Sequence, residues 1–280
     1  MAPGSHAALG ALKCSLMRWI IGDVHGMLRP LETVIAAVRA ADPKPHFIFT
    51  GDYVNRGPDS RGVVDFLLTL DSARFVRGNH DDMFDQVLSG YSYTCERGDD
   101  ERLMAFESFM RFGLDQTFLS YGEDWAELQA LLRRPRIDKL LRMIECVPDA
   151  HRRFFRDLPL VVEEDDLFVA HAKWDPADAT DEPPLAERLR RDATLQHRAL
   201  WGRFEPRELS LPKAWRRTGF FGHTPTMIYD ESMNKSPRPV AGPRVVLLDT
   251  AAFDRDGRLT AFCADTGNYV QANHLGIPIQ

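Results

Sequence analysis

The feature that most constrains the fold is an alternation of apolar strand-like segments and amphipathic helical segments near the start of the chain. Residues 18–21, 46–50 and 75–76 are short and largely apolar, and each is soon followed by a glycine, which predicts three strands. Residues 28–41 and 60–70 carry apolar side chains at helical spacing, which predicts two helices between those strands. Because a strand–helix–strand unit joins parallel neighbours, the sequence predicts an α/β fold built on a parallel sheet.

Each predicted strand ends in a glycine-containing loop whose side chains can bind metals. Residues 22–26 read G-D-V-H-G, residues 51–57 read G-D-Y-V-N-R-G, and residues 78–81 read G-N-H-D. The carboxyl ends of parallel strands lie along one edge of a sheet, so we expect the three loops to meet. Carboxylate oxygen, imidazole nitrogen and amide oxygen suit manganese, iron and zinc, and a carboxylate can bridge two such ions. The loops therefore predict a site for divalent metals.

Two later histidines stand in equivalent positions at the ends of other predicted strands. His171 follows the apolar segment 167–170, and His223 follows segment 218–221 within a Gly-His-Thr-Pro sequence. A single histidine at the end of a strand is more often structural than a ligand, and a lone D-x-H motif is weak. Three motif blocks in this order and at this spacing are improbable as accidents, so the combination favours metal ligation.

The rest of the chain predicts a helical segment followed by a second sheet. Residues 83–157 are rich in charge, with apolar residues at helical spacing, and we expect a helical insertion or cap there. Five later segments with strand-like patterns are expected to form one second sheet: 160–162, 167–170, 218–221, 245–248 and 259–263. We expect residues 1–16 to be a flexible leader, with Met17 as an alternative start, and residues 17–280 to form a single domain.

Composition and charge narrow the classes of partner. The 280-residue chain is 44% hydrophobic and 27% charged, which is typical of a packed globular protein. Its net charge of -6 offers no general positive field for a nucleic-acid duplex. No apolar run approaches the ~20 residues that a bilayer crossing needs, so we expect no membrane partner. The four cysteines form no C-x-x-C pair and the N-terminus lacks the pattern of a secretion signal, which together predict a cytoplasmic protein. The oligomeric state is left open.

Taken together, the motif blocks resemble those of the phosphoprotein phosphatase family within the calcineurin-like metallophosphoesterases. That family's pattern is G-D-x-H-G, G-D-x-x-x-R-G, G-N-H-[DE], H-A and G-H, and the chain matches every block in order between Arg18 and about Asn268. The resemblance implies a four-layer α/β sandwich of two mixed β-sheets flanked by helices, with a helical insertion. It also implies two divalent metal ions as cofactors, manganese before iron or zinc.

The resemblance assigns a metal-binding role to each matched residue. It implies a dinuclear centre in which one carboxylate, that of Asp52, bridges the two ions. The implied ligands are Asp23, His25 and Asp52 for the first metal, and Asp52, Asn79, His171 and His223 for the second.

The same resemblance implies a proton donor and a phosphate clamp. His80 matches the general acid that protonates the leaving oxygen, and Asp81 is expected to orient its imidazole through a hydrogen bond. Arg56, Asn79 and Arg203 are expected to bind the phosphate, the last because its W-G-R segment resembles the W-x-R of phage and bacterial phosphatases. The implied reaction is in-line attack on phosphorus by a hydroxide that bridges the metals, without a covalent phosphoenzyme.

Departures from the family pattern leave the substrate class open. Asn55 stands where protein phosphatases usually have aspartate, and Asp81 stands where many have glutamate and diadenosine tetraphosphatases have aspartate. Tyr53, Val54 and the W-G-R segment instead favour a protein phosphatase of the bacterial serine/threonine type. Our first prediction is therefore a metal-dependent phosphatase that acts on phosphoserine or phosphothreonine in proteins, or on similar small phosphoesters.

Two alternatives stand beside this prediction. One is a symmetrical bis(5'-nucleosyl)-tetraphosphatase, which hydrolyses diadenosine tetraphosphate. The other is an inactive phosphate-binding regulatory module, although a protein that only binds phosphate has no need of a general acid. Lys173 and Trp174 follow where the family commonly has Ala-Gly, and they could bind phosphate, stack on a base or simply pack.

Overall fold

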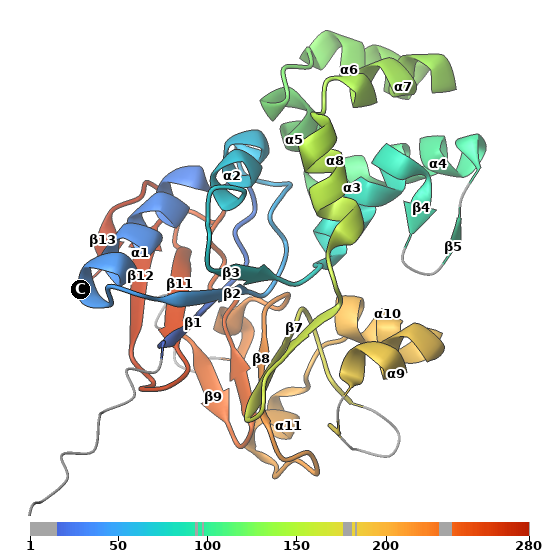
Figure 1. The fold of residues 1–280 in the computed structure, drawn as a ribbon. Helices are drawn as coiled ribbons and strands as arrows, with labels where there is room; N and C mark the ends of the chain where they lie inside the picture. The colour runs from blue at the N-terminus through green and yellow to red at the C-terminus, as the bar shows by residue number, and fades with distance from the viewer. Residues whose placement is uncertain are drawn as a thin grey trace, which may run out of the picture.

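The computed structural model describes most of the chain (Figure 1). The described residues are 16–92, 95–96, 98–175, 181–182, 184–229 and 237–279. Apart from Leu16, the expected leader lies outside these residues. The division of the chain into a leader and one domain with an insertion stays a prediction.

The first sheet contains the three strands predicted near the start of the chain. Its members, in spatial order, are β13 (Pro278–Ile279), β12 (Tyr269–Asn273), β11 (Arg258–Cys263), β1 (Arg18–Ile21), β2 (His46–Phe49) and β3 (Ala73–Phe75). Strands β1, β2 and β3 run parallel, as the strand–helix–strand pattern predicts. Strand β11 pairs antiparallel with β1, which makes the sheet mixed.

The second sheet has five strands, and one predicted member is missing from it. In spatial order they are β6 (Val161–Glu163), β7 (Leu167–Ala170), β8 (Thr218–Phe221), β10 (Val245–Leu247) and β9 (Val240–Gly242). The expected membership of segment 259–263 is wrong, because this segment forms β11 and pairs with β1, Trp19 lying opposite Cys263. Its apolar pattern predicts a buried strand but carries no information on which sheet supplies the neighbour.

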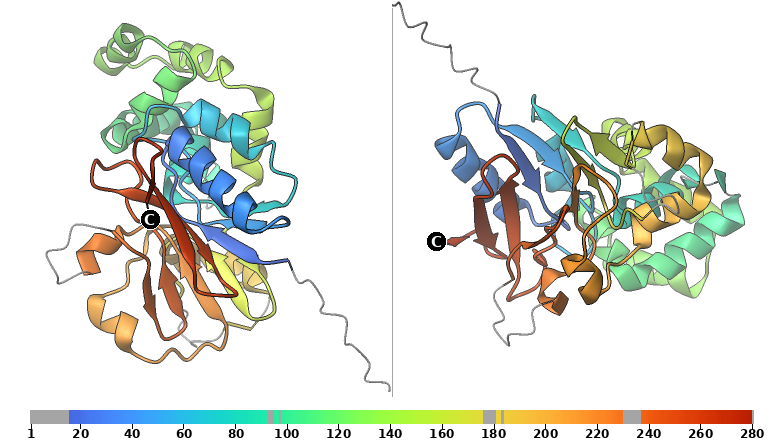
Figure 2. Two further views of the ribbon diagram at one scale, coloured as in Figure 1. Left: turned by 90° about the vertical axis from the view of Figure 1, so that its left-hand side faces the viewer. Right: turned by 90° about the horizontal axis from the view of Figure 1, so that it is seen from below.

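The two sheets and their helices form four layers. Along β1, Ile20 faces the second sheet and packs with Val169 and Phe220, whereas Trp19 and Ile21 face helices on the outside. Helices α1 (Leu28–Ala41) and α2 (Ser60–Leu67) cover the outer face of the first sheet, and α9 (Leu185–Arg191), α10 (Ala193–Trp201) and α11 (Pro206–Ser210) cover that of the second. Figure 2 shows both sheets between α1 and the α9–α10 pair. The expected α/β sandwich of two mixed sheets flanked by helices is confirmed.

Helices fill most of the segment between the two sheets. They are α3 (Asn79–Ser89), α4 (Asp99–Phe109), the 3-10 turn η1 (Met110–Phe112), α5 (Leu114–Ser120), α6 (Trp125–Arg133), α7 (Ile137–Glu145) and α8 (Asp149–Asp157), with a small hairpin of β4 (Tyr91–Ser92) and β5 (Cys95–Glu96) after α3. Because α3 begins at Asn79, the G-N-H-D block is the first turn of a helix rather than the expected loop. A further 3-10 turn, η2 (Thr226–Tyr229), follows β8.

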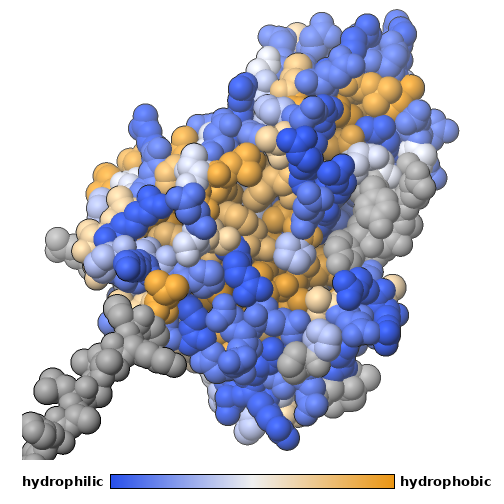
Figure 3. Space-filling model, in the orientation of Figure 1, coloured by the Kyte–Doolittle hydropathy of each residue, from blue (hydrophilic) through white to orange (hydrophobic). Residues whose placement is uncertain are grey.

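Two surface features complete the description. The face shown in Figure 3 exposes apolar side chains around a groove of about 580 Å³ between β3 and α8, lined in part by Phe75, Phe154 and Leu158. None of the predicted site residues lines this groove. Within the described residues, no helix is both long and apolar enough to cross a membrane.

A buried arginine joins the first sheet to the helical segment. Arg77 follows β3 and is only 2% exposed. Its Nη1 donates to carboxylate oxygens of Asp82 and Asp85 on α3, at 3.1 and 3.0 Å. Its Nη2 donates to the backbone oxygens of Phe155 and Arg156 on α8. One guanidinium therefore fixes both α3, which carries site residues, and α8.

Replacing this arginine should be costly. We expect Arg77→Met to lower the free energy of unfolding by roughly 3–5 kcal/mol, because it removes the buried cation that pairs with two buried carboxylates. Arg74→Met is the matched control: Arg74 forms a partly exposed ion pair with Glu164 at 3.3 Å, and its loss should cost about 0–1 kcal/mol. Urea unfolding of both variants measures the difference, and equal losses would contradict the anchoring role.

Candidate metal centre and active site

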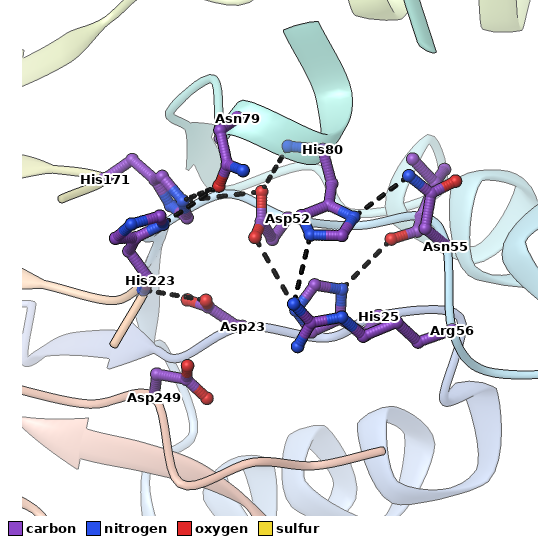
Figure 4. A network of polar contacts seen from close by, with 12 residues as sticks. Asp23, His25, Asp52, Asn55, Arg56, Asn79, His80, His171, His223 and Asp249 are labelled. Atoms are coloured by element: carbon purple, nitrogen blue, oxygen red, sulfur yellow. Dashed lines mark hydrogen bonds and ion pairs between the residues drawn. The ribbon is translucent and has the colours of Figure 1, made fainter. Parts of the chain in front are cut away.

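The predicted ligands lie at the carboxyl ends of strands from both sheets (Figure 4). The first sheet and the start of α3 supply Asp23, His25, Asp52 and Asn79, and the second sheet supplies His171 and His223. Strand ends that point the same way thus bring together side chains separated by up to two hundred positions in the sequence. The geometry agrees with the convergence that the strand-end loops predict.

The loops at this site have unusual backbone conformations. Among the described residues, seven that are not glycine have positive φ, and five of them belong to the site: His25 at 48°, Asp52 at 55°, Asn55 at 71°, Arg56 at 68° and His223 at 68°. Such left-handed conformations cost free energy in residues with a Cβ atom. They persist only where neighbouring groups hold them, and they cluster at functional sites.

The carboxylate of Asp81 is one of the groups that hold the loops. It accepts backbone N–H bonds from Asp52 and Gly78, both at 2.8 Å, and from Tyr53 at 2.9 Å. The expected hydrogen bond from Asp81 to His80 is therefore wrong, because both carboxylate oxygens already face the backbone of neighbouring loops. Burial raises the pKa of Asp81 to about 6, against the lowering effect of these three N–H groups. Asp81 positions the ligand loops rather than the imidazole.

Two glycines let other groups approach the ligands. A Cβ atom at Gly78 would lie 2.1 Å from Oδ1 of Asp52, and one at Gly222 would lie 1.8 Å from Oδ1 of Asp23. Both distances are far shorter than a van der Waals contact, so any side chain here would displace a carboxylate. This close approach requires glycine at both positions.

Asp52 lies between two groups of donor atoms. Its Oδ2 is 3.5 Å from Nε2 of His25, and its Oδ1 is 3.4 Å from Nε2 of His171. Donor atoms of His25, Asp52 and His80 lie within 4.8 Å of one another, as do those of Asp52, His171 and His223. A carboxylate shared by two such groups has the arrangement that a bridging ligand requires.

The other two expected ligands border these groups. Oδ1 of Asn79 lies 2.9 Å from Nε2 of His171 and 3.0 Å from Nδ1 of His223. Asp23 belongs to neither group: its oxygens accept hydrogen bonds from the hydroxyl of Thr50 at 3.0 Å and from the backbone N–H of His223 at 2.8 Å. In this structure His80, rather than Asp23, completes the donor group around His25.

Burial controls the charge state of the site. It lowers the pKa of His171 to about 3 and that of His223 to about 2, so both imidazoles are neutral and have a lone pair to offer. Burial also raises the pKa values of Asp23 and Asp52 well above their usual range, and neighbouring carboxylates add to the effect. Neutral imidazoles beside buried carboxylates form a donor set that suits divalent cations. The residues present therefore fit two metal ions.

Comparison with known proteins decides the family. The family model for calcineurin-like phosphoesterases matches residues 18–226, most of the chain, including all six predicted ligands. The chain belongs to the calcineurin-like phosphoesterase family. When bound, two divalent ions at such a centre would neutralise the charge of a phosphoester and lower the pKa of a neighbouring water.

Individual relatives are similar to this phosphoesterase over a much shorter stretch than the family model. A symmetrical bis(5'-nucleosyl)-tetraphosphatase from Coxiella burnetii (strain RSA 493 / Nine Mile phase I) is 43% identical over 70 residues, covering 25% of this chain and 24% of the relative. A protein of the same name from Pectobacterium carotovorum is 43% identical over 75 residues, covering 26% and 27%. The chain thus covers only about a quarter of these relatives' length. A solved structure described as a candidate diadenosine tetraphosphatase aligns with 96% of both chains at a TM-score of 0.53 and 20% identity, which supports the fold alone.

The two arginines expected to clamp phosphate lie near the centre of this phosphoesterase. Arg56 is exposed, its guanidinium stacks over Phe253 at 4.3 Å, and its Nη2 lies 3.2 Å from Nε2 of His80. Arg203 is also exposed, and its charge helps to lower the pKa values of His223 and Asp249. Within the described residues, neither arginine has a carboxylate partner at ion-pair distance. Both cations are therefore available to an anionic ligand.

Asp249 is a site residue that the sequence analysis missed. It follows β10, is 1% exposed, and accepts a hydrogen bond from the backbone N–H of Ala251 at 2.9 Å. Its other oxygen, Oδ2, has no hydrogen-bond partner among the described residues. Burial raises the pKa of Asp249 to about 6, and its charge helps to raise the pKa values of Asp23 and Asp52. An acidic residue just after an apolar strand is the signal that could have identified it.

Neutralising this carboxylate should have opposite effects on the metal-free and metal-loaded protein. We expect Asp249→Asn to raise the unfolding temperature in EDTA, because it removes like-charge repulsion from a buried site. We also expect manganese affinity to fall on the order of tenfold, as when a group beside a metal's ligands is lost. Thermal unfolding and calorimetric titration measure the two effects, with Asp71→Asn at an exposed position as the control. If neither quantity changes, Asp249 lies outside the electrostatics of the centre.

Proposed function

We propose that this calcineurin-like phosphoesterase hydrolyses phosphate monoesters, with phosphoserine and phosphothreonine in proteins as the substrate class. The observation that carries the proposal is the pair of exposed arginines without carboxylate partners beside the donor groups. Two guanidiniums can each hold two oxygens of a terminal, doubly charged phosphoryl group. We further propose manganese as the metal and the cytoplasm as the location.

The side chains have distinct roles in this proposal. Arg56 and Arg203 bind the phosphoryl oxygens and stabilise the charge that they carry in the transition state. His80 donates a proton to the leaving oxygen as that oxygen separates from phosphorus. Asn55, which lies 3.0 Å from the other nitrogen of His80, occupies the position expected for Asp81. Asn79 is a ligand that also borders the phosphate.

Two sequence features that were expected to bear on the substrate class are buried or paired in the structure. Tyr53 and Val54 are fully buried, and the Tyr53 hydroxyl donates to the backbone oxygen of Val76, so neither can touch a substrate. Lys173 pairs with Glu208 at 2.9 Å, and Trp174 is 1% exposed, so this pair packs rather than binding phosphate or a base. Our proposal for the substrate class therefore depends on Arg56 and Arg203 and on whether a leaving group can reach His80.

A second candidate is symmetrical cleavage of a dinucleoside tetraphosphate. It is favoured by the names of the curated relatives, although the similarity spans only about a quarter of their length. The matched stretch is too short to show that this chain has the activity of these relatives. We rank it second because an internal phosphate of a tetraphosphate has fewer free oxygens for two arginines.

A substrate panel separates the two candidates. We expect manganese-loaded protein to show a higher kcat/KM on phosphoserine and phosphothreonine peptides than on diadenosine tetraphosphate. Activity should vanish in EDTA. Cleavage of the dinucleotide alone would replace the first candidate with the second. No turnover on any phosphoester would favour an inactive phosphate-binding module.

Two substitutions separate proton donation from metal binding. We expect His80→Asn to lower kcat on phosphopeptides by about 10²–10⁴-fold, the usual contribution of a general acid. Most of the metal should be retained, because the six proposed ligands stay in place even though His80 lies within the donor group around His25. Asp52→Asn should instead deplete both metals, because Asp52 stands between the two donor groups. Metal analysis beside rate measurements tests the pair. Full activity of His80→Asn on a poor leaving group would exclude proton donation by His80.

A further inference from the structure

The first sheet ends at β3, whose outer edge has no neighbouring strand among the described residues (Figure 1). In a parallel pair, alternate residues of an edge strand turn their backbone N–H and C=O groups toward the neighbour, and the residues between them turn these groups away. The backbone oxygen of Ser72 accepts a hydrogen bond from β2 at 3.0 Å, and the N–H of Val76 donates one to β2 at 3.2 Å. By this alternation, the backbone groups of Ala73 and Phe75 point away from β2.

The chain itself pairs with this outer edge, but only beyond the end of β3. Arg77 is the next residue in the outward-pointing series, and its N–H donates to the backbone oxygen of Pro159 at 2.7 Å. Within the described residues, the outward backbone groups of Ala73 and Phe75 have no such partner. Both residues are only partly buried, so another chain can reach them. An open edge of this kind is a template for an added strand.

The open edge lies in the apolar groove between β3 and α8 (Figure 3). Ala73 and Phe75 line this groove of about 580 Å³ together with Leu68, at the end of α2, and Phe154, on α8. Leu68 is 48% exposed, and the rings of Phe75 and Phe154 lie 5.3 Å apart. Side chains of a strand alternate between its two faces, so an added strand would place every second side chain beside these apolar groups.

The charges of the groove favour an acidic ligand. Its charged lining residues are Arg74, Arg153 and Asp157. Arg74 pairs with Glu164 at 3.3 Å, and Asp157 pairs with Arg156 at 3.2 Å. Arg153 is exposed and, within the described residues, has no carboxylate at ion-pair distance. The groove therefore offers one unpaired positive charge, although the chain as a whole has a net charge of -6.

A second copy of this chain fits the edge less well than an acidic peptide does. Two copies of β3 that pair about their middle residue would place the two Arg74 side chains opposite each other. Like charges directly opposite on neighbouring strands are destabilising. A carboxylate near Arg153 has the complementary charge instead.

We propose that this groove is a docking site for an extended peptide segment of a protein partner, which adds to β3 as a further strand. The backbone groups of Ala73 and Phe75 bind the main chain of the peptide. Apolar side chains at alternate positions of the peptide contact Leu68 and Phe154, and an acidic residue lies beside Arg153. None of the predicted site residues lines the groove, so the docking site does not depend on the proposed phosphatase activity.

A set of synthetic peptides tests the addition of a strand. The probes are fluorescein-labelled D-T-X-T-X-T-E, in which X is Val, Ile, Leu or Phe, and fluorescence anisotropy measures their binding to the full chain. Binding by none of them would overturn the proposal. The best probe is then N-methylated either at its X residues or at its threonines. We expect one pattern to abolish binding and the other to preserve it, because only alternate N–H groups face β3. Equal effects of the two patterns would exclude strand addition.

Amide hydrogen exchange locates the bound peptide. In NMR spectra we expect saturating probe to slow the exchange of the Ala73 and Phe75 amides on the order of tenfold, because these N–H groups gain hydrogen-bond partners. The amide of Arg74 already faces β2 and should change much less. Unchanged exchange at both outward amides would place the peptide elsewhere and contradict the proposal.

Variants of the edge and of the apolar wall give matched controls. Ala73→Pro removes one outward N–H at the first residue of an edge strand, where proline is tolerated, and should weaken binding on the order of tenfold. Leu68→Ser, at an exposed position, should weaken it by a similar factor through lost apolar contact. Leu211→Ser is the control, because Leu211 also follows a helix, is 54% exposed and lies outside the groove. Equal affinities of the two serine variants would contradict the proposal even if the proline variant fails to fold.

Charge reversal tests the acidic chemistry of the ligand. We expect Arg153→Glu to weaken binding of the acidic probe by about fivefold, and to affect a neutral N-T-X-T-X-T-Q probe much less. Arg133→Glu, at an exposed position of α6 outside the groove, should leave both affinities unchanged. If Arg153→Glu binds the acidic probe as tightly as the native protein does, the proposed charge complementarity is wrong.

Three further measurements separate this partner from other occupants. Affinity for the probe should be the same in manganese and in EDTA, and its loss in EDTA would place the acidic peptide at the metal centre. Light scattering should show no dimer that Ala73→Pro dissociates, since such a dimer would assign the edge to a second copy. A synthetic peptide of residues 1–15 should bind more weakly than the best probe, because tighter binding would assign the groove to the chain's own N-terminal segment. Any of these contrary results would overturn the proposal, whether or not the protein proves to be a phosphatase.

Discussion

The structure depends on one electrostatic constraint, which is that several carboxylates share a single buried site. Asp23, Asp52 and Asp249 are each at most 2% exposed. The charges of Asp52 and Asp249 raise the pKa of Asp23, and that of Asp249 also raises the pKa of Asp52. The neighbouring imidazoles of His171 and His223 are neutral and cannot compensate this charge. Divalent cations would relieve the repulsion, which would link metal binding to the electrostatic stability of the fold at this site. The same cations would attract a phosphoester.

The local part of this arrangement could be predicted from sequence. Strand ends were marked by a glycine after an apolar segment, and parallel strands place such ends along one edge, so the meeting of Asp52 with His25 followed from the pattern. The approach of His171 from the second sheet was implied by the family resemblance. The strand at 18–21 likewise followed from its apolar residues. These features depend on short-range periodicity and on general rules of connection.

What sequence could not provide depends on contacts between distant segments. The partner of β11 is decided by which strand edge is left open, a property of the assembled sheet. The role of Asp81 depends on three backbone N–H groups that meet only after the loops fold, which is why an imidazole contact was expected in its place. Asp249 lies beyond the matched family residues 18–226, and its position after an apolar strand was too weak a signal without the burial that the structure shows.

The strained loop shows why the helical segment and the metal centre belong to one functional unit. Consecutive positive φ angles at Asn55 and Arg56 are unfavourable by themselves, so their geometry needs partners outside the loop. Gly113 and Thr117 provide these partners from a segment that contributes no expected ligand. The positions of η1 and α5 relative to the sheets therefore affect Asn55 and Arg56 directly, through these two hydrogen bonds. If Arg56 binds phosphate as proposed, substitutions in this segment should alter that role while the expected metal ligands stay the same.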